Sequence, residues 1–423
     1  MRVVILTHVY PPEHAPAGMN AAELAHELTE AGHQVTVLTG FPSHPAGPLF
    51  DGWKAKLSLR EEAANGFTVV RCVHSFVPRF RLIAKLWYYA TFAFTSFCVG
   101  LFQGHFDVLV MQSTPIFGAV TGILLAKLRK AQVFYWVHDV HPESALNAKL
   151  IREGIATWVM KGIDSWVCTK SAVVGVLTED MRQLLLDRGL AEKHVIIQRH
   201  WVDEARIHPS ARQNGWREKH GIFPGQFVVL HAGTIGYISG ASVILEAAKL
   251  LQERTDILFL FVGDGPLKVE LQKTAAAHKL RNVRFLPFQP EEALNDMQAT
   301  ADVGLVTLNP GSGSSSIPSK MHGYTAAGRP VIASVDAESA TASLISEGNF
   351  GWVVPSRDAN ALADVITYVA TDRNMCEEKG ANARAFFVSE FGREAVTLQF
   401  RRKLEILHRY RRKSGPNIDI AQA

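Results

Sequence analysis

A stretch rich in glycine and serine before Lys320 is the part of this sequence whose residue types most directly suggest chemistry. Residues 311–317 hold two glycines and four serines, and a helix is predicted from Pro318 to Ala327, closed by a left-handed residue at Gly328. At such a helix start, free backbone N–H groups, the positive end of the helix dipole and the Lys320 ammonium converge on one small volume. This arrangement indicates phosphate binding, although an ordinary turn with a solvated lysine fits the local pattern equally well. The candidate phosphate-binding residues are Ser314, Ser315, Ser316, Ile317, Pro318, Ser319 and Lys320.

Two further glycine turns occur in the same half of the chain, each after a short apolar run. The runs 227–232 and 257–262 predict strands buried on both faces of a parallel sheet. A strand, a glycine loop and then a helix allow backbone N–H groups to meet a phosphate; the ordinary alternative is a tight turn. The candidate binding residues of the two turns are Gly233, Thr234, Gly236, Gly263, Asp264 and Gly265.

In the first half of the chain, the candidate chemical residues are His138, Asp139 and Glu143. They come directly after an apolar run at 132–137, and open α/β sheets bind ligands at the carboxyl ends of their strands. A lone histidine at a strand end is more often structural than functional. The clustering of three titratable residues therefore favours a ligand site at this strand end.

Gly18 is a further candidate, because it lies at the entry of the first predicted helix. A strand at 2–6, a helix at 19–31 and a second strand at 34–39 form a βαβ unit, which implies a parallel sheet. A glycine at this point permits close approach of the backbone to a ligand, or serves only a turn with positive φ.

The elements that must position these residues alternate between strand and helix in both halves of the chain. With 423 residues and 47% hydrophobic content, the chain suits two domains of about 200 residues, each with its own core. We predict an α/β fold of two Rossmann-like, doubly wound parallel-sheet domains. The predicted domains are residues 1–205 and 206–390, followed at 391–423 by a basic amphipathic helix and a tail.

Composition excludes several classes of function. A net charge of +4 is mild, and the basic residues form no nucleic-acid-binding module. The four cysteines are far apart, so neither a zinc site nor a disulfide framework is indicated, and no Asp-x-Asp motif suggests a metal. The apolar start is too short for a signal peptide and is expected to be a buried strand. A cytoplasmic protein is therefore expected.

The longest apolar segment, residues 83–102, approaches the length of about 20 residues that a membrane span requires. Lys85 lies within it, polar residues are interspersed, and it precedes a strand at 107–111 that the sheet needs. A crossover helix packed on the sheet is the first expectation. The alternative is an interfacial helix, with Arg79, Arg81 and Lys85 against anionic lipid.

The motif around Lys320 resembles a known family. Pro318-Ser319-Lys320, then Tyr324, then 327–333 (AGRPVIA) are similar to the donor-site signature of the retaining family 4 glycosyltransferases, which have the GT-B fold. The resemblance implies two domains that face a cleft, a nucleotide-sugar donor, transfer with retention and no metal or other cofactor. It also implies a last helix that crosses back to the first domain. Two carboxylates, eight residues apart in the family, are replaced here by Ser315 and Gly323.

The resemblance also implies roles for the residues of the first half. The stretch from His138 to Ser144 resembles the branch that builds colanic acid and O-antigen, where lipid-linked saccharides are acceptors at the inner membrane. His138 would then hydrogen-bond the donor sugar, and Asp139 or Glu143 would orient an acceptor hydroxyl. Gly18 would belong to a glycine loop of the donor site. Peripheral contact with the inner face of the cytoplasmic membrane is expected.

Two other readings stay open. The lost acidic pair is compatible with a non-catalytic GT-B subunit of a polysaccharide assembly complex. A GT-B sugar-nucleotide epimerase would share the fold and would act on the nucleotide-sugar alone.

Overall fold

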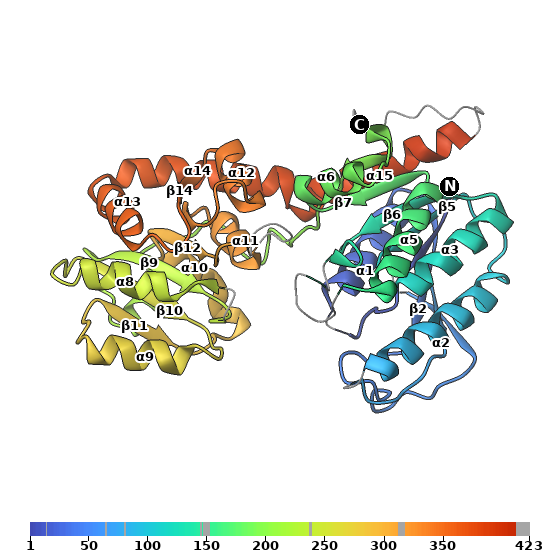
Figure 1. Ribbon diagram of the computed structural model, residues 1–423, viewed down its shortest axis with the longest axis horizontal. Helices are drawn as coiled ribbons and strands as arrows, with labels where there is room; N and C mark the ends of the chain where they lie inside the picture. The colour runs from blue at the N-terminus through green and yellow to red at the C-terminus, as the bar shows by residue number, and fades with distance from the viewer. Residues whose placement is uncertain are drawn as a thin grey trace. The chain divides into compact units, whose positions relative to one another are not determined.

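The computed structural model (Figure 1) describes residues 1–13, 15–63, 66–79, 82–143, 146, 153–236, 239–311 and 318–411. The chain divides into two compact units. Unit 1 comprises Met1–His200 and Val396–Ala423, and unit 2 comprises Trp201–Ala395. Each unit has its own apolar core.

Unit 1 is built on one sheet. Among its described residues, eight strands pair in the order β3-β4-β2-β1-β5-β6-β7-β8, and all are parallel except the antiparallel edge strand β3. The strands are β1 (Arg2–Leu6), β2 (Gln34–Gly40), β3 (Ser58–Glu62), β4 (Thr68–Cys72), β5 (Val108–Gln112), β6 (Gln132–Val137), β7 (Val173–Val176) and β8 (Val195–Ile197). The central strands β1 and β5 are apolar and buried on both faces, as crossover helices require.

Helices cover both faces of this sheet. They are α1 (Pro16–Glu30), α2 (Leu82–Gly100), α3 (Ile116–Arg129), α5 (Ile155–Lys170), α6 (Glu179–Asp187) and the short 3₁₀ turn η1 (Glu192–His194). Helix α3 packs between α2 and α5 (Figure 1). The strand order reverses between β1 and β5, and such a switch point is where doubly wound sheets bind ligands.

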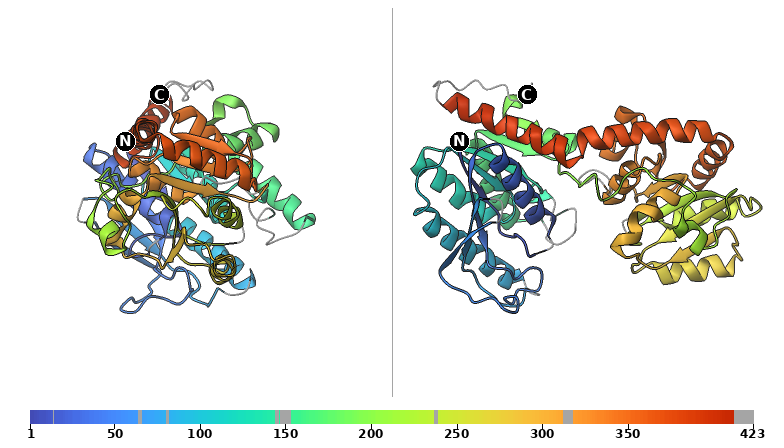
Figure 2. Two further views of the ribbon diagram at one scale, coloured as in Figure 1. Left: turned by 90° about the vertical axis from the view of Figure 1, so that its left-hand side faces the viewer. Right: turned by 180° about the vertical axis from the view of Figure 1, so that it is seen from behind.

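The chain ends in the long helix α15 (Arg393–Arg411), drawn in red in Figure 2. From Val396 onward it packs on unit 1: Phe400 lies 4.7 Å, ring centroid to centroid, from Phe134. Lys403 Nζ donates to the carbonyl of Ile197 at 3.0 Å. Part of the basic face of this helix is therefore used in packing.

Unit 2 repeats the plan with a fully parallel sheet. Its described strands pair in the order β11-β10-β9-β12-β13-β14. They are β9 (Phe227–Ala232), β10 (Ile257–Val262), β11 (Val283–Leu286), β12 (Val303–Thr307), β13 (Val331–Ser334) and β14 (Gly351–Val354). The helices are α7 (Gly215–Lys219), α8 (Ser242–Leu250), α9 (Lys268–Ala277), α10 (Leu294–Thr300) after the 3₁₀ turn η3 (Glu291–Ala293), α11 (Ser319–Ala326), α12 (Ala340–Gly348), α13 (Ala359–Thr371) and α14 (Arg373–Glu390). The predicted pair of doubly wound α/β domains is thus confirmed.

The apolar segment around residues 83–102 forms α2. Its inner side packs on the sheet through Tyr88 and Phe92, which are buried. Its outer side is apolar and exposed: Trp87 is 59% and Phe94 68% accessible. Within the described residues, no helix has both the length and the apolar character needed to cross a membrane.

Candidate active site

Helix α11 begins one residue later than expected. Pro318 is its N-cap, with extended backbone (φ −61°, ψ 122°), and not its first helical residue, so that prediction was wrong by one position. Gly328 closes the helix region with φ +66°, as predicted. The candidates Ser314, Ser315, Ser316 and Ile317 lie outside the described residues, whereas Ser319 is exposed in the first turn of α11.

Lys320, in the first turn of α11, meets a histidine that sequence reasoning missed. Its ammonium donates to Nε2 of His231, in β9, at a distance of 3.2 Å. Burial lowers the pKa of Lys320 to about 8. Burial, and then the charge of Lys320, hold the pKa of His231 well below its usual value, so the imidazole is a neutral acceptor. A cation poorly solvated beside a helix N-terminus is a strong partner for an incoming phosphate.

Tyr324 fixes α11 to the sheet. It is fully buried, and its hydroxyl accepts a hydrogen bond from the backbone N–H of Ala232 at 2.8 Å. A Cβ placed on Gly304 would lie 2.2 Å from the ring of Tyr324. The tyrosine of the motif therefore positions the helix that carries Lys320, at the end of the strand that carries His231.

Tyr324→Phe is expected to destabilise unit 2 by about 1–3 kcal/mol, because the buried N–H of Ala232 loses its acceptor. Denaturant unfolding measures this change. Tyr368→Phe is the matched control, because Tyr368 is 59% exposed on α13. Equal stability of the two variants would contradict the role given to the Tyr324 hydroxyl.

The two glycine turns interlock with each other. A Cβ on Gly263 would lie 1.9 Å from the Gly233 carbonyl oxygen, and one on Gly265 would lie 2.3 Å from that of Ile235. The N–H of Ile235 donates to the Asp264 carbonyl at 2.9 Å. These glycines are therefore required by the contact between the turns.

The interlocked turns leave their polar groups available. Thr234 and the Asp264 side chain are exposed, and Gly236 is partly exposed. The Asp264 carboxylate accepts the N–H of Gly265 at 2.7 Å. Both turns follow adjacent strands, β9 and β10, at the same sheet edge as His231, so the structure brings these predicted donor residues to one edge.

Asp336, which sequence reasoning missed, lies at the same edge after β13. Its carboxylate accepts the N–H of Gly311 at 2.7 Å and the hydroxyl of Ser356 at 2.5 Å. The Ser356 bond, and then that from Gly311, lower the pKa of Asp336. The acid thereby anchors the residue at which the loop before α11 begins. The sequence signal that could have identified Asp336 is its place, two positions after a buried strand.

In unit 1, His138 directly follows β6. Its backbone N–H donates to Ser113 Oγ at 3.0 Å, and its ring packs edge-on against Trp136 and His200, with centroids 4.7 and 4.4 Å away. Its Nε2 is buried and has no hydrogen-bond partner among the described residues. Burial, then His200 and His8, hold the His138 pKa well below its usual value. A neutral imidazole with one unsatisfied nitrogen is suited to a ligand hydroxyl.

The other two candidates in this segment have different surroundings. Asp139 is exposed, and its N–H donates to Ser113 Oγ at 3.2 Å. Glu143 forms an ion pair with Arg188, whose other guanidinium nitrogen bonds the buried Asp164 at 2.8 Å. Glu143 therefore ties the segment after β6 to the end of α6. Catalytic roles for both residues stay predictions.

A cluster of ionisable residues that the sequence did not single out lies at the carboxyl end of β1, β2 and β4. Glu13 is buried and accepts backbone N–H groups from Ser43 and His44 at 2.8 and 2.7 Å. Burial, then His44 and Arg79, lower the pKa of His8 to about 3. These residues follow the carboxyl ends of parallel strands, where such sheets bind ligands. That placement was the only signal in the sequence that could have identified them.

The alternative interpretation of residues 83–102 placed Arg79 against anionic lipid, and for Arg79 it was wrong. Arg79 is 8% exposed, and its guanidinium lies over the Tyr88 ring, 3.5 Å from the centroid. Stacking on the aromatic ring and a hydrogen bond to Ser43 hold it inside the unit. Arg81 lies outside the described residues.

Gly18 lies within the first turn of α1. A Cβ there would come within 2.8 Å of the Val9 carbonyl oxygen, and its backbone is not in the left-handed region. Neither alternative drawn from the sequence describes the contact: the glycine accommodates the chain's own loop after β1. Donor binding by Gly18 stays a prediction.

Two family models cover most of the chain. Residues 17–199 match the glycosyl transferase 4-like domain, and residues 212–386 match the glycosyl transferases group 1. The two matches follow the division into units. The chain belongs to the group 1 glycosyltransferases with the GT-B fold.

Individual relatives agree with this assignment. The chain is 26% identical over 346 residues to WcaI of Escherichia coli strain K12, named as a colanic acid biosynthesis glycosyl transferase, covering 80% of this chain and 84% of that protein. It is 28% identical over 264 residues to WbjE of Pseudomonas aeruginosa, named as a glycosyltransferase, covering 62% and 65%. Among solved structures, Anabaena Alr3699/HepE in complex with UDP-glucose aligns with a TM-score of 0.63 at 16% identity, covering 96% and 99%.

Proposed function

We propose that this glycosyltransferase moves a sugar from a nucleotide-sugar to a lipid-linked saccharide acceptor, with retention of configuration and without a metal. The relatives named for colanic acid synthesis support a role in bacterial surface polysaccharide biosynthesis. The likeness in fold to a protein solved with UDP-glucose is compatible with such a donor.

One observation carries the proposal: the Lys320–His231 pair at the start of α11. The departing group in such a transfer is a nucleoside diphosphate, which develops negative charge as the bond to the sugar breaks. A partly desolvated ammonium and the amide groups of a helix N-terminus stabilise that charge without metal. The exposed Thr234 and Asp264 of the glycine turns lie at the same sheet edge.

His138 supplies the polar contact expected on the sugar side. Its buried, unsatisfied Nε2 would bind a sugar hydroxyl in the donor complex. In a front-side displacement the sugar gains oxocarbenium character, and a fixed hydrogen bond then acts most in the transition state. Asp139, exposed beside it, would orient the acceptor hydroxyl.

The test is transfer of labelled sugar to a lipid-linked acceptor, after a thermal-shift screen has identified the nucleotide-sugar that binds. Activity should persist in EDTA, and NMR of the product should show the donor's anomeric configuration. Loss of activity in EDTA or an inverted product would contradict the corresponding part of the proposal.

The same assay separates the two alternatives. An epimerase converts the nucleotide-sugar without acceptor, whereas a transferase leaves its sugar configuration unchanged. A non-catalytic subunit would neither convert the donor nor transfer it. The Lys320–His231 pair favours the transferase, because an assembly subunit has no need of a desolvated cation at a helix N-terminus.

The acceptor's lipid would bring the protein to a membrane, and an apolar face of unit 1 fits that contact. Helices α2, α3 and α5 lie side by side (Figure 1), with a groove of about 520 Å³ between α3 and α5. The exposed apolar residues of these helices include Trp87, Phe94, Leu124, Ile155, Trp158 and Trp166. Exposed tryptophans beside lysines such as Lys161 suit the interface of an anionic bilayer.

Trp158→Glu combined with Phe94→Glu is expected to abolish binding to vesicles that contain anionic lipid, because two charges would enter the apolar layer. Vesicle flotation measures this. Phe223→Glu, at a side chain 70% exposed on unit 2, is the matched control and should still float. Binding by the double variant, or retention of the wild type in the bilayer after carbonate, would contradict peripheral docking by this face.

A further inference from the structure

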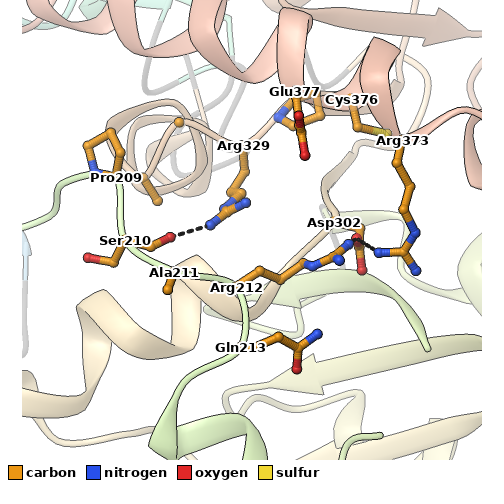
Figure 3. Close-up of a pocket in the computed structure, with 13 residues that line it drawn as sticks. Pro209, Ser210, Ala211, Arg212, Gln213, Asp302, Arg329, Arg373, Cys376 and Glu377 are labelled. Carbon is orange, nitrogen blue, oxygen red and sulfur yellow. Dashed lines mark hydrogen bonds and ion pairs between the residues drawn. The ribbon is translucent and has the colours of Figure 1, made fainter. Parts of the chain in front are cut away.

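A second pocket in unit 2 lies at the opposite edge of the sheet from Lys320. It encloses about 460 Å³ and is lined by the segment 209–213, by residues 327–330 and by the first turn of α14 (Figure 3). Asp302 and Pro330, in its wall, directly precede β12 and β13. In a parallel sheet the amino ends of strands lie away from the carboxyl ends, so this pocket is separate from the donor residues. Its volume is typical of small-molecule sites.

Three guanidinium groups converge on the pocket, but their pairing is unequal. Arg212 and Arg373 both bond the buried carboxylate of Asp302. That carboxylate also accepts the N–H of Val228 at 2.7 Å, so its oxygens are fully engaged. Arg329 instead donates to a backbone carbonyl, that of Ser210, at 2.7 Å.

Arg329 is an arginine of this pocket whose hydrogen bonding is incomplete among the described residues. Its Nε is buried and has no partner within the described part of the chain. Burial lowers the pKa of Arg329; the charges of Asp302 and Glu377 oppose this effect, and those of Arg212 and Arg217 add to it. A guanidinium desolvated beside two others gains more from an incoming anion than an exposed one does.

The pocket also contains a second carboxylate, that of Glu377, whose charge acts on Arg329. Glu377, on the first turn of α14, is exposed and faces the same space in Figure 3. A carboxylate accepts hydrogen bonds from hydroxyl groups. Guanidinium groups with a nearby carboxylate thus match a ligand that has a phosphate at one end and hydroxyls at the other.

We propose that this pocket binds a sugar phosphate, with the phosphate on Arg329 and Arg212 and the sugar hydroxyls on Glu377. The planar fork of Arg329 suits bidentate contact with phosphate oxygens. The N-terminus of α14, an 18-residue helix capped by the Asp372 carboxylate, lies at the same wall. The ligand would join the segment 209–213 to α14 and so tighten unit 2.

The experiment is isothermal titration of the full chain with inorganic phosphate and with glucose 6-phosphate. Both should bind the wild type and the Lys320→Ala variant equally, because the donor residues lie at the other sheet edge. Arg329→Gln should weaken both probes by about tenfold or more. Glu377→Gln, at an exposed side chain, removes a negative charge that acts on Arg329, so phosphate should bind at least as well as to the wild type. Glucose 6-phosphate, which also loses a carboxylate acceptor for its hydroxyls, should lose affinity relative to phosphate.

Arg254→Gln is the matched control, since Arg254 is an arginine of unit 2 that pairs with Asp256 away from the pocket. It should bind both probes as the wild type does. Melting curves establish that Arg329→Gln is folded, and Glu377→Gln tests the pocket without changing a buried contact. Absence of binding by either probe at millimolar concentration would overturn the proposal. So would equal binding by Arg329→Gln and Arg254→Gln, or loss of binding in Lys320→Ala.

Discussion

Lys320→Ala is expected to lower the rate of sugar transfer by about 100-fold or more and to weaken nucleotide binding at the same time. The ammonium lies at the N-terminus of α11, 3.2 Å from His231 Nε2, where a diphosphate would replace or share that contact. The Lys320 ammonium attracts the bound nucleotide, and it stabilises the departing diphosphate still more. Its removal should therefore lower both the nucleotide affinity and kcat. Steady-state kinetics and titration with the nucleotide measure the two effects.

The same lysine predicts a dependence on pH. Burial lowers its pKa to about 8 in the free protein, and a bound diphosphate would raise that value by favouring the charged form. Nucleotide affinity should therefore be highest below pH 8 and fall as the pH rises above it. In Lys320→Ala this dependence should disappear.

Lys273→Ala provides the control, because Lys273 is an exposed lysine of α9 and its removal changes the net charge equally. It should retain activity, affinity and the pH profile. If Lys320→Ala keeps wild-type affinity and rate, Lys320 does not belong to the donor site.

His138→Ala is expected to lower kcat by about 100-fold, while nucleotide affinity and melting temperature change little. The nucleotide is assigned to unit 2, so removal of an imidazole in unit 1 should spare its affinity. The buried Nε2 has no partner to lose among the described residues, which limits the effect on stability. Turnover with the cognate donor and acceptor, beside a melting curve, makes the comparison.

A conservative variant separates binding from packing. The amide of His138→Gln can place an N–H near the position of Nε2, so this variant should recover part of the lost kcat. His138→Leu fills the same space between Trp136 and His200 without a polar atom and should stay as inactive as His138→Ala. If activity follows stability alone, His138 is a packing residue, and the catalytic role passes to Asp139 or Glu143.

The sequence by itself determined the central strands of both units. Strands such as 132–137 and 257–262 are buried on both faces, so they read as continuous apolar runs that helices do not imitate at such short length. Turn chemistry located the end of α11 at Gly328, because φ +66° is a conformation that favours glycine. The motif around Lys320 led to the correct family, because its residues are adjacent in the sequence.

Some elements carried too weak a local signal to be predicted. Strand β3 was not expected, because it alternates exposed and partly exposed residues at the sheet edge. Helix α5 was also missed, since its exposed Ile155 and Trp158 disguise the amphipathic pattern. An element that buries little apolar surface, or that exposes it, lacks the periodicity on which sequence reasoning depends.

Only the tertiary structure decided which side chains meet. His231 and Lys320 are 89 positions apart in the sequence and form a hydrogen bond. Arg188 and Glu143 are 45 positions apart and form an ion pair. The same packing buried Arg79 and gathered three arginines at the amino edge of the second sheet. It also left Nε2 of His138 without a partner among the described residues. Hydrogen bonding and desolvation depend on distances in space, and periodicity along a chain specifies an element and its buried face but not its partner.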